Sequence, residues 1–470
     1  MTDTRRARRG AVVALLAVTL VALPTGGASA ARGDDVPLDA WTPLPAADEV
    51  VVSEEARALR EDLLGPDALD PGLVTLTWTG VSSFVVTIGG HLLLFDAWEI
   101  VGIHAGYLPI GREELAGLEP EAVLVGHGHF DHAADVGHVA GRTGATVVGS
   151  QEICDRARAD ARYDGLDDTF PCAITGTATT PPPGTTQELA LFADLPPITV
   201  LQHVHSAVNP PGGGNRLDPF LPIFDPLPYL QLNLDPAELA RFLRSLDAPQ
   251  GGTWLYHLAV GDLTVLLGDS AGPLFDAPEV AEALRHGFPG CVDVMSNAIL
   301  GFGQLVSGLQ DPGAYVEAVG PHVFLPTHGD AWMPVISAGQ ARYAGRLHAE
   351  LATLEHPPEI DLLLDPQDYL VPRRYEVDDP RWATPPPGSS CAEAADDADR
   401  GEAAPDPAPV ATRDEPPSPE VNGREDADDA ATPTTSPRPP LPVTGGGLVG
   451  LGVGALVVGG GLRRRLDGPR

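Results

Sequence analysis

Residues 127–132, His-Gly-His-Phe-Asp-His, place three imidazoles and one carboxylate within a single turn of chain. Imidazole nitrogens and carboxylate oxygens are the ligands that zinc takes where thiolates are absent. In a chain with this content of histidine and acidic residues, such a pattern arises by chance on the order of once in 500 sequences. The stretch therefore predicts a metal site built from His127, His129, Asp131 and His132.

The surroundings of this stretch strengthen the prediction. Residues 122–125 form a short apolar run typical of a buried strand, and Gly126 and Gly128 allow the backbone to turn sharply after it. Asp131 can cap a helix predicted over residues 131–140. The four candidate ligands should therefore converge at the end of a strand.

Four other apolar runs also end in residues that can bind metal. Because open α/β sheets build sites at strand ends, these residues are candidates for the same site. They are Asp96 after 92–95, His203 and His205 after 198–201, Asp269 after 264–267, and His328 after 322–325.

Short apolar runs alternate with helical patterns between residues 73 and 375, which is the signature of a layered α/β protein. Strands are predicted at 73–78, 84–88, 92–95, 122–125, 146–148, 198–201, 254–260, 264–267 and 322–325. Helices are predicted at 53–64, 131–140, 152–162, 236–246, 278–286 and 337–354. Two long connections rich in proline and glycine, 165–197 and 206–235, separate some of them, and the second is interpreted as a substrate lid.

The HxHxDH stretch, followed by a further histidine, a Gly-Asp pair and a final histidine, resembles the metallo-β-lactamase superfamily. The resemblance spans residues 73–375 and implies a four-layer αββα sandwich. The region opens with Thr77-Trp78-Thr79-Gly80 and closes with Thr327-His328-Gly329-Asp330, and these two segments look most like the branch that contains ascorbate-lactonase-like and phospholipase-D-like proteins.

The resemblance implies two groups of metal ligands. One metal would take His127, His129 and a third histidine, and the other would take Asp131, His132 and His328. Asp269 would bridge the two metals, and Asp96 would orient ligands from behind them. The third histidine is either His203 or His205, and we favour His205 because Ser206, a small residue, follows it.

Two divalent metal ions at such a site lower the pKa of a shared water, so that hydroxide can attack an ester, lactone, amide or phosphodiester of a small molecule. Asp131 and Asp269 are the candidate catalytic residues, with Asp131 as a proton acceptor. Zinc is the first candidate metal, and manganese or iron suits the same ligands. A non-catalytic surface protein that binds a metal or ligand on the same fold is the alternative.

Both ends of the chain carry targeting patterns. Residues 1–30 combine an arginine cluster, an apolar run and small residues before a cleavage point, as in a secretory signal peptide. Residues 441–470 begin Leu-Pro-Val-Thr-Gly, continue with an apolar segment and end in arginines, which resembles the sorting signal of Gram-positive surface proteins. By that resemblance a sortase would cut between Thr444 and Gly445 and join Thr444 to peptidoglycan, outside the cell. A permanent membrane anchor is the alternative.

The remaining segments are predicted from composition. Residues 31–72 should form an N-terminal helix and connector, and residues 376–440, with 16 acidic and 5 basic side chains, a disordered stalk. The 29 basic residues of the chain are all arginine, which together with the sorting signal suggests an actinobacterial source. The formal net charge of −36 argues against nucleic acid as a partner.

Four cysteines in an exported chain are compatible with two disulfides. The nearest pairing joins Cys154 to Cys172 and leaves Cys291 with Cys391. Free buried thiols are the alternative, and without a CxxC spacing these cysteines are poor zinc ligands.

Overall fold

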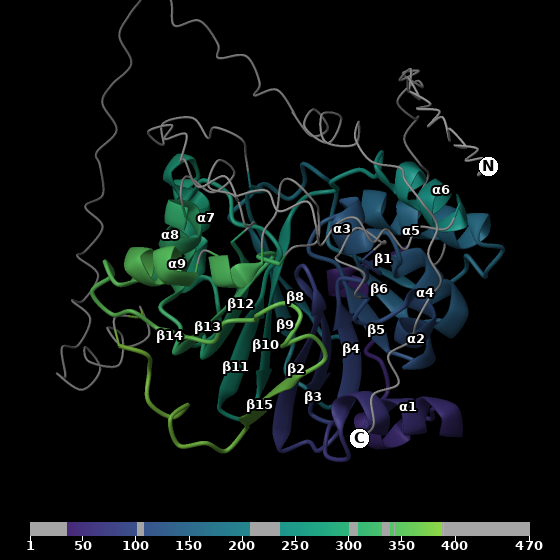
Figure 1. Cartoon of the computed structure of the whole chain (residues 1–470), viewed down its shortest axis with the longest axis horizontal. Coiled ribbons are helices and arrows are strands. Elements are labelled where there is room, and N and C mark those ends of the chain that lie inside the picture. The colour runs from purple at the N-terminus through teal and green to yellow at the C-terminus, as the bar shows by residue number, and fades with distance from the viewer. Residues whose placement is uncertain are drawn as a thin grey trace, which may run out of the picture. The chain divides into compact units, whose positions relative to one another are not determined.

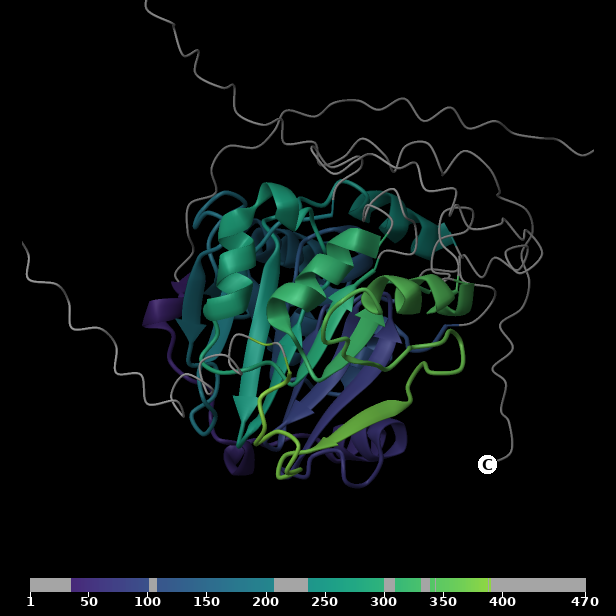
Figure 2. The same cartoon turned by 90° about the vertical axis from the view of Figure 1, so that its left-hand side faces the viewer.

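A computed structural model describes residues 35–100, 108–206, 236–299, 309–330, 339–342, 344–387 and 389. Two mixed β-sheets lie face to face in this region, and helices cover the outer face of each (Figure 1). Figure 2 shows the helices that cover the second sheet from their own side. The predicted αββα sandwich is confirmed.

The first sheet has eight strands in the order β1-β7-β6-β5-β4-β3-β2-β15. Strands β2, β3 and β4 are antiparallel neighbours, whereas β4 to β7 run parallel. The bounds are β1 Asp35–Pro37, β2 Leu73–Gly80, β3 Ser83–Ile88, β4 His91–Phe95, β5 Ala122–Leu124, β6 Thr146–Gly149, β7 Cys172–Ile174 and β15 Pro372–Glu376. The sheet thus takes in one strand from upstream of the predicted domain.

The second sheet has seven strands in the order β14-β13-β12-β11-β10-β9-β8. Strands β8 to β11 are antiparallel neighbours, and β11 to β14 run parallel. The bounds are β8 Thr186–Leu189, β9 Ile198–Gln202, β10 Trp254–Val260, β11 Leu263–Leu267, β12 Val294–Ala298, β13 Val323–Thr327 and β14 Glu359–Ile360.

The helices flank the two sheets on their outer faces (Figure 1). Those on the side of the first sheet are α1 Glu54–Leu64, α2 Arg112–Gly117, α3 Phe130–Ala133, α4 Val136–Thr143, α5 Gln151–Tyr163 and α6 Pro236–Ser245. Those on the second sheet are α7 Pro278–His286, α8 Gln310–Val319 and α9 Ala344–Leu351.

Strand β11 shows how the sequence builds these layers. Val265 and Leu267 join the larger core cluster, which includes residues from both sheets, whereas Leu266 joins the cluster packed with α7, α8 and α9. Successive side chains of a strand point to opposite faces, so an uninterrupted apolar run is what a strand buried on both faces requires. The apolar runs of the sequence are of this kind.

The predicted helix over 131–140 is wrong in its continuity, because the structure breaks it into α3 and α4. The backbone N–H of Asp135 donates to the carbonyl of Ala97, and its carboxylate accepts the N–H of Glu99 at 2.7 Å. These bonds to the loop after β4 replace helical ones at this point. Asp131 does not cap the helix either, since His129 holds the N-cap position without a side-chain bond.

Several elements lack a clear sequence signal. Strand β12 reads Val-Met-Ser-Asn-Ala, and its two polar residues interrupt the apolar pattern although both are buried. The connection predicted at 165–197 contains β7 and β8, so it is not a simple loop. The lid predicted at 206–235 lies outside the described residues apart from Ser206.

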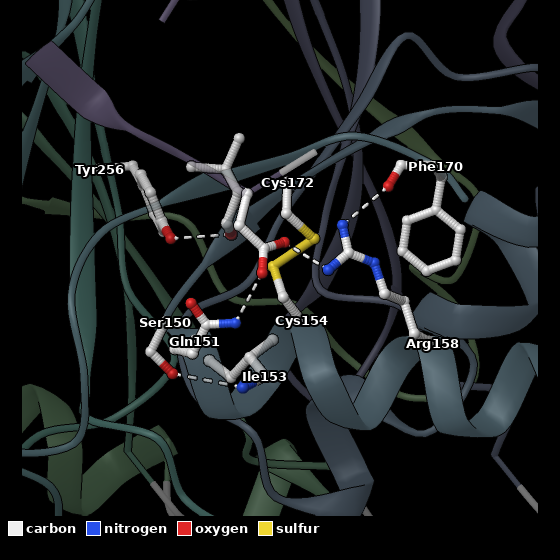
Figure 3. Close-up of a disulfide and its surroundings, with 10 residues drawn as sticks. Ser150, Gln151, Ile153, Cys154, Arg158, Phe170, Cys172 and Tyr256 are labelled. Atoms are coloured by element: carbon white, nitrogen blue, oxygen red, sulfur yellow. Dashed lines mark hydrogen bonds and ion pairs between the residues drawn. A yellow bond between two sulfur atoms is a disulfide. The ribbon is translucent and has the colours of Figure 1, made fainter. Parts of the chain in front are cut away.

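The disulfide predicted between Cys154 and Cys172 is confirmed and ties α5 to β7 (Figure 3). Beside it, Arg158 of α5 forms an ion pair with Asp35 of β1, and both side chains are almost fully buried. Arg158 also donates to the carbonyl of Phe170 at 3.1 Å. The disulfide and the ion pair thus hold β1 and β7 against α5.

The second predicted disulfide stays a prediction, because Cys391 lies outside the described residues. Ser389, two residues earlier in the chain, lies against Gly320, just before β13, and Cys291 lies just before the neighbouring strand β12. We expect peptide mapping under non-reducing conditions to recover a Cys291–Cys391 peptide that disappears on reduction. Recovery of either cysteine as an alkylated thiol from unreduced protein would contradict the pairing.

Within the described residues, no helix is both long and apolar enough to cross a membrane. The apolar segment of the predicted sorting signal is outside this part of the chain.

His91, at the start of β4, lies between two carboxylates. Its Nδ1 is 2.7 Å from Glu121 Oε2, its Nε2 is 2.8 Å from Asp194 Oδ1, and its ring stacks on Phe192. Burial by itself would lower the pKa of His91, but the hydrogen bonds to Glu121 and Asp194 outweigh it and raise the pKa. The imidazolium therefore links the start of β4 to the loop after β8.

Replacing His91 with glutamine should make the stability of the chain less dependent on pH. A group with a raised pKa stabilises the fold fully below its unfolded value of 6.5, and this contribution is lost as the pH rises through the folded value. Asp194 has a lowered pKa, so its contribution is lost below about 3.8 as the carboxylate protonates. Between these pH limits, denaturant unfolding should give the wild type a free energy of unfolding roughly 2 kcal/mol higher than that of His91→Gln. This difference should disappear above neutral pH. A gap independent of pH would contradict a charged His91.

Candidate metal centre

Five strands bring the candidate ligands to one edge of the structure. In the first sheet, β4 and β5 run parallel and lead to Asp96 and His127. In the second sheet, β11 and β13 run parallel to β12, and β9 has the same direction because two antiparallel pairings separate it from β11. Strands β9, β11 and β13 lead to His205, Asp269 and His328, so the carboxyl ends of all five strands carry these residues.

Three histidines form one group of donors, the three-histidine cluster. The Nε2 atom of His127 lies 3.0 Å from Nδ1 of His129 and 3.1 Å from Nε2 of His205. All three donor atoms lie within 4.8 Å of one another. Such a spacing lets one metal ion contact all three.

A second group, the Asp131 cluster, adjoins the first. Oδ2 of Asp131 lies 3.1 Å from Nε2 of His328 and 3.7 Å from Nε2 of His132. Only the Asp131 side chain is more than slightly exposed, at 10%. Both groups match the ligand sets that the resemblance implies, and their donor chemistry fits divalent metals.

Two carboxylates lie behind the imidazoles, on the side of the Nδ1 atoms. Oδ2 of Asp269 is 2.7 Å from Nδ1 of His127, and Oδ2 of Asp96 is 2.9 Å from Nδ1 of His132. Asp96 Oδ1 also accepts the backbone N–H of Gly126. Carboxylates in this place fix the ring orientation and make the opposite nitrogen a better ligand.

The position of Asp269 differs from that of a simple bridge. Its Oδ2 also lies 3.4 Å from Nδ1 of His132, so this oxygen faces the backs of two imidazoles. Its Oδ1 is fully buried and has no hydrogen-bond partner among the described residues. A buried carboxylate oxygen without a partner costs free energy, and a cation is one way to satisfy it.

The protonation of the site suits cation binding. Burial lowers the pKa values of His127 and His132 well below the ordinary value, and that of His205 to about 3. Burial alone would raise the pKa of Asp131, but the electrostatic interaction with the nearby His132 ring and the hydrogen bond with His328 outweigh burial and lower it. Neutral imidazoles and an ionised carboxylate are the forms that bind metals.

His203 and His205 were the two candidates for the third histidine at the end of β9, and His203 faces away from the site. Its Nδ1 is 2.9 Å from the hydroxyl of Tyr315 in α8, and burial lowers its pKa to about 3. No donor group among the described residues includes His203, whereas His205 belongs to the three-histidine cluster. The geometry therefore favours His205, in agreement with the sequence argument.

Sequence reasoning missed the neighbours that hold these ligands. Tyr315 lies in a helix that also contains glycine and proline, and nothing in that pattern indicates a contact with His203. Gly126 was predicted only to let the chain turn. In the structure it also lies so close to Asp269 that a Cβ atom would be 2.2 Å from the carboxylate carbon.

Comparison with known proteins points to one superfamily. Residues 76–214 match the sequence profile described as the metallo-beta-lactamase superfamily. A "UPF0173 metal-dependent hydrolase" of Pyrobaculum neutrophilum is 35% identical over 78 residues, which cover 17% of this chain and 33% of that protein. A protein of the same description from Aeropyrum pernix is 30% identical over 145 residues, 30% of this chain and 55% of that protein.

The chain thus spans between a third and about half of the length of these curated relatives. Among solved structures, Igni18, a metallo hydrolase of Ignicoccus hospitalis, aligns with a TM-score of 0.41 and 15% identity. The alignment covers 65% of this chain and 99% of Igni18.

Proposed function

We propose that this chain, whose residues 76–214 match the metallo-beta-lactamase superfamily profile, is a metal-dependent hydrolase of that superfamily acting on a small molecule. The observation that carries the proposal is the pair of adjoining donor groups at the strand ends, the three-histidine cluster and the Asp131 cluster. Two complete groups side by side favour an enzyme over a binding protein on the same fold, because a protein without turnover would be expected to lose at least one ligand. The bond that is cut is an ester, lactone, amide or phosphodiester.

We assign the ligands as follows. His127, His129 and His205 would hold one divalent ion, and Asp131, His132 and His328 would hold a second, with zinc as the first candidate and manganese or iron as alternatives. Oδ1 of Asp269, which has no hydrogen-bond partner among the described residues, would be the oxygen free to contact metal, while its Oδ2 keeps His127 in place.

Metal ions at this place supply Lewis-acid activation of water and stabilise negative charge that develops on the substrate. The protein residues supply orientation and proton transfer. Asp96 and Asp269 hold the rings of His132 and His127 from behind, so that their Nε2 atoms point into the donor groups. The lowered pKa of Asp131 favours its ionised form, in which the carboxylate could accept a proton from water.

The test measures metal and turnover together. The predicted mature chain, residues 31–444, would be purified, reconstituted with zinc or manganese and analysed by elemental mass spectrometry. Chromogenic esters, lactones, phosphodiesters and a cephalosporin would be assayed in parallel. About two ions per chain, with turnover of one substrate class, is the expected result.

Other outcomes separate the alternatives. Stoichiometric metal without turnover of any substrate would favour a surface metal-binding protein on the same fold. No stoichiometric metal after reconstitution would contradict the assignment of the site.

We further propose that the chain is exported and attached to peptidoglycan by a sortase. The Leu-Pro-Val-Thr-Gly segment and the signal-like residues 1–30 support this, and so does the disulfide between Cys154 and Cys172, because disulfides persist in oxidising compartments. Lysozyme-type digestion of the cell wall should release the protein, whereas Thr444→Ala should send it to the membrane or medium. Release of the wild type by detergent alone would favour a membrane anchor.

A further inference from the structure

Two neighbouring residues at the metal centre, His328 and Val81, share with Asp96 a backbone conformation that side chains disfavour. His328 has φ +58° and Val81, in the turn between β2 and β3, has φ +52°. Left-handed backbone is uncommon outside glycine and is an outlier for a β-branched residue such as valine. A strained residue persists where its surroundings over-determine it, and such residues cluster at functional sites.

Hydrogen bonds join these two residues directly. The backbone N–H of His328 donates to the carbonyl of Val81 at 2.8 Å, and the indole N–H of Trp78 donates to the same carbonyl at 3.0 Å. The N–H of Val81 donates to Oδ2 of Asp330 at 3.1 Å. Both backbone polar groups of Val81 are thus engaged, and the chain from His328 to Asp330 closes on Val81 at both ends.

Tyr369 completes the arrangement from a third part of the chain. Its hydroxyl donates to Oδ2 of Asp330 at 2.5 Å, and its ring stacks on Trp78 with centroids 4.4 Å apart. Val81, Asp330 and Trp78 are completely buried, and Tyr369 is 4% exposed. A buried carboxylate that accepts two hydrogen bonds is a costly group to disturb.

This arrangement lies where the two sheets meet the site. Val81 belongs to the turn between two strands of the first sheet, whereas His328 follows a strand of the second. Close by, the hydroxyls of Ser82 and Thr327 are 3.2 Å apart and make a second link across the same junction. The conformation of His328 therefore depends on residues outside its own sheet.

We infer that Val81, Asp330 and Tyr369 form a clamp that positions His328 for metal binding. The inference rests on the proposed function, since it concerns how the Asp131 cluster holds its ion. Asp330 fixes Val81, and Val81 fixes the backbone of His328, whose Nε2 then lies 3.1 Å from Asp131. The three are positioning residues, since none of them belongs to a donor group.

Equilibrium metal binding tests the clamp without reference to activity. Zinc affinity would be measured by competition with a chromogenic chelator, and cobalt absorption would distinguish the two donor groups. Loss of His328 should identify one ion, and loss of His129 the other. Asp330→Ala should lower the affinity for the first ion by about 10- to 100-fold and leave the affinity for the second unchanged. Tyr369→Phe, which keeps the stacked ring, should lower the affinity for the first ion to a smaller extent.

Two further variants act as controls. Asp330→Asn keeps an oxygen where Oδ2 lies and should retain more affinity than Asp330→Ala. Tyr375→Phe removes another buried tyrosine hydroxyl, one without a hydrogen-bond partner among the described residues, and should leave both ions unchanged. Circular dichroism of the metal-free proteins checks folding, and if Asp330→Ala does not fold, Tyr369→Phe decides.

The outcomes separate this inference from the proposed function. A wild type with two ions and folded variants with unchanged affinities would overturn the clamp alone. An equal loss of affinity for both ions would also overturn it, because the substitution would then disturb the whole site rather than His328 alone. A wild type that binds no metal would overturn the proposed function and the clamp together.

Discussion

Replacing His127 with alanine should abolish both metal retention and hydrolysis. His127 belongs to two donor groups, one with His129 and His205 on its Nε2 side and one with His132 and Asp269, which faces its Nδ1. Its loss also leaves the carboxylate of Asp269 buried without its nearest hydrogen-bond donor. Since changes to residues behind a ligand cost roughly 10- to 100-fold, we expect kcat/KM to fall by more than 100-fold.

The matched control is His286→Ala on the surface of α7. His286 is 55% exposed and changes the histidine count without touching the site. Elemental analysis and the chromogenic assay should find it indistinguishable from wild type. If His127→Ala kept two ions and measurable turnover, the three-histidine cluster would have to be abandoned as a ligand set.

Replacing Gly126 with alanine should damage the centre without removing any ligand. The new Cβ would lie 2.2 Å from both the carboxylate carbon and Oδ2 of Asp269, which is fully buried and hydrogen-bonded to His127. Overpacking of a dense interior and the loss of that hydrogen bond should together cost at least about 3 kcal/mol. The displaced Asp269 should also release the ring of His127 and weaken metal binding.

Gly345→Ala is the matching glycine control. A Cβ at Gly345, in α9, would meet nothing within 4 Å, so alanine should be neutral or slightly stabilising there. Thermal or denaturant unfolding of the metal-free proteins measures the loss of stability, and chelator competition measures the loss of metal affinity. Wild-type stability and affinity in Gly126→Ala would show that Asp269 does not need its observed position.

Local pattern was enough to predict much of the fold. Helix α7 and strand β10 have the predicted bounds, and most other predicted strands are correct to within a residue or two. An apolar run such as 92–95 predicts a buried strand because burial on both faces leaves no room for polar side chains. Where buried residues are polar, as in β12, the same rule fails.

The sequence by itself also determined the first group of candidate ligands. His127, His129, Asp131 and His132 lie within one turn of chain, so their proximity follows from covalent connection and a sharp turn. The resemblance to the metallo-β-lactamase superfamily rests on the same stretch and on the order of the later histidines. None of this required knowledge of distant contacts.

Only the tertiary structure decided which distant residues meet and by which atoms. Strand β9 ends at Gln202, so the alternation that would put His203 and His205 on one face does not continue beyond it, and the two turn to different partners. Asp269 contacts Nδ1 of His127, and the N–H of His328 donates to the carbonyl of Val81. Each contact joins segments that are more than a hundred residues apart in the chain. Periodicity records only which side of its own strand a residue occupies, whereas these contacts arise from how two sheets pack against each other.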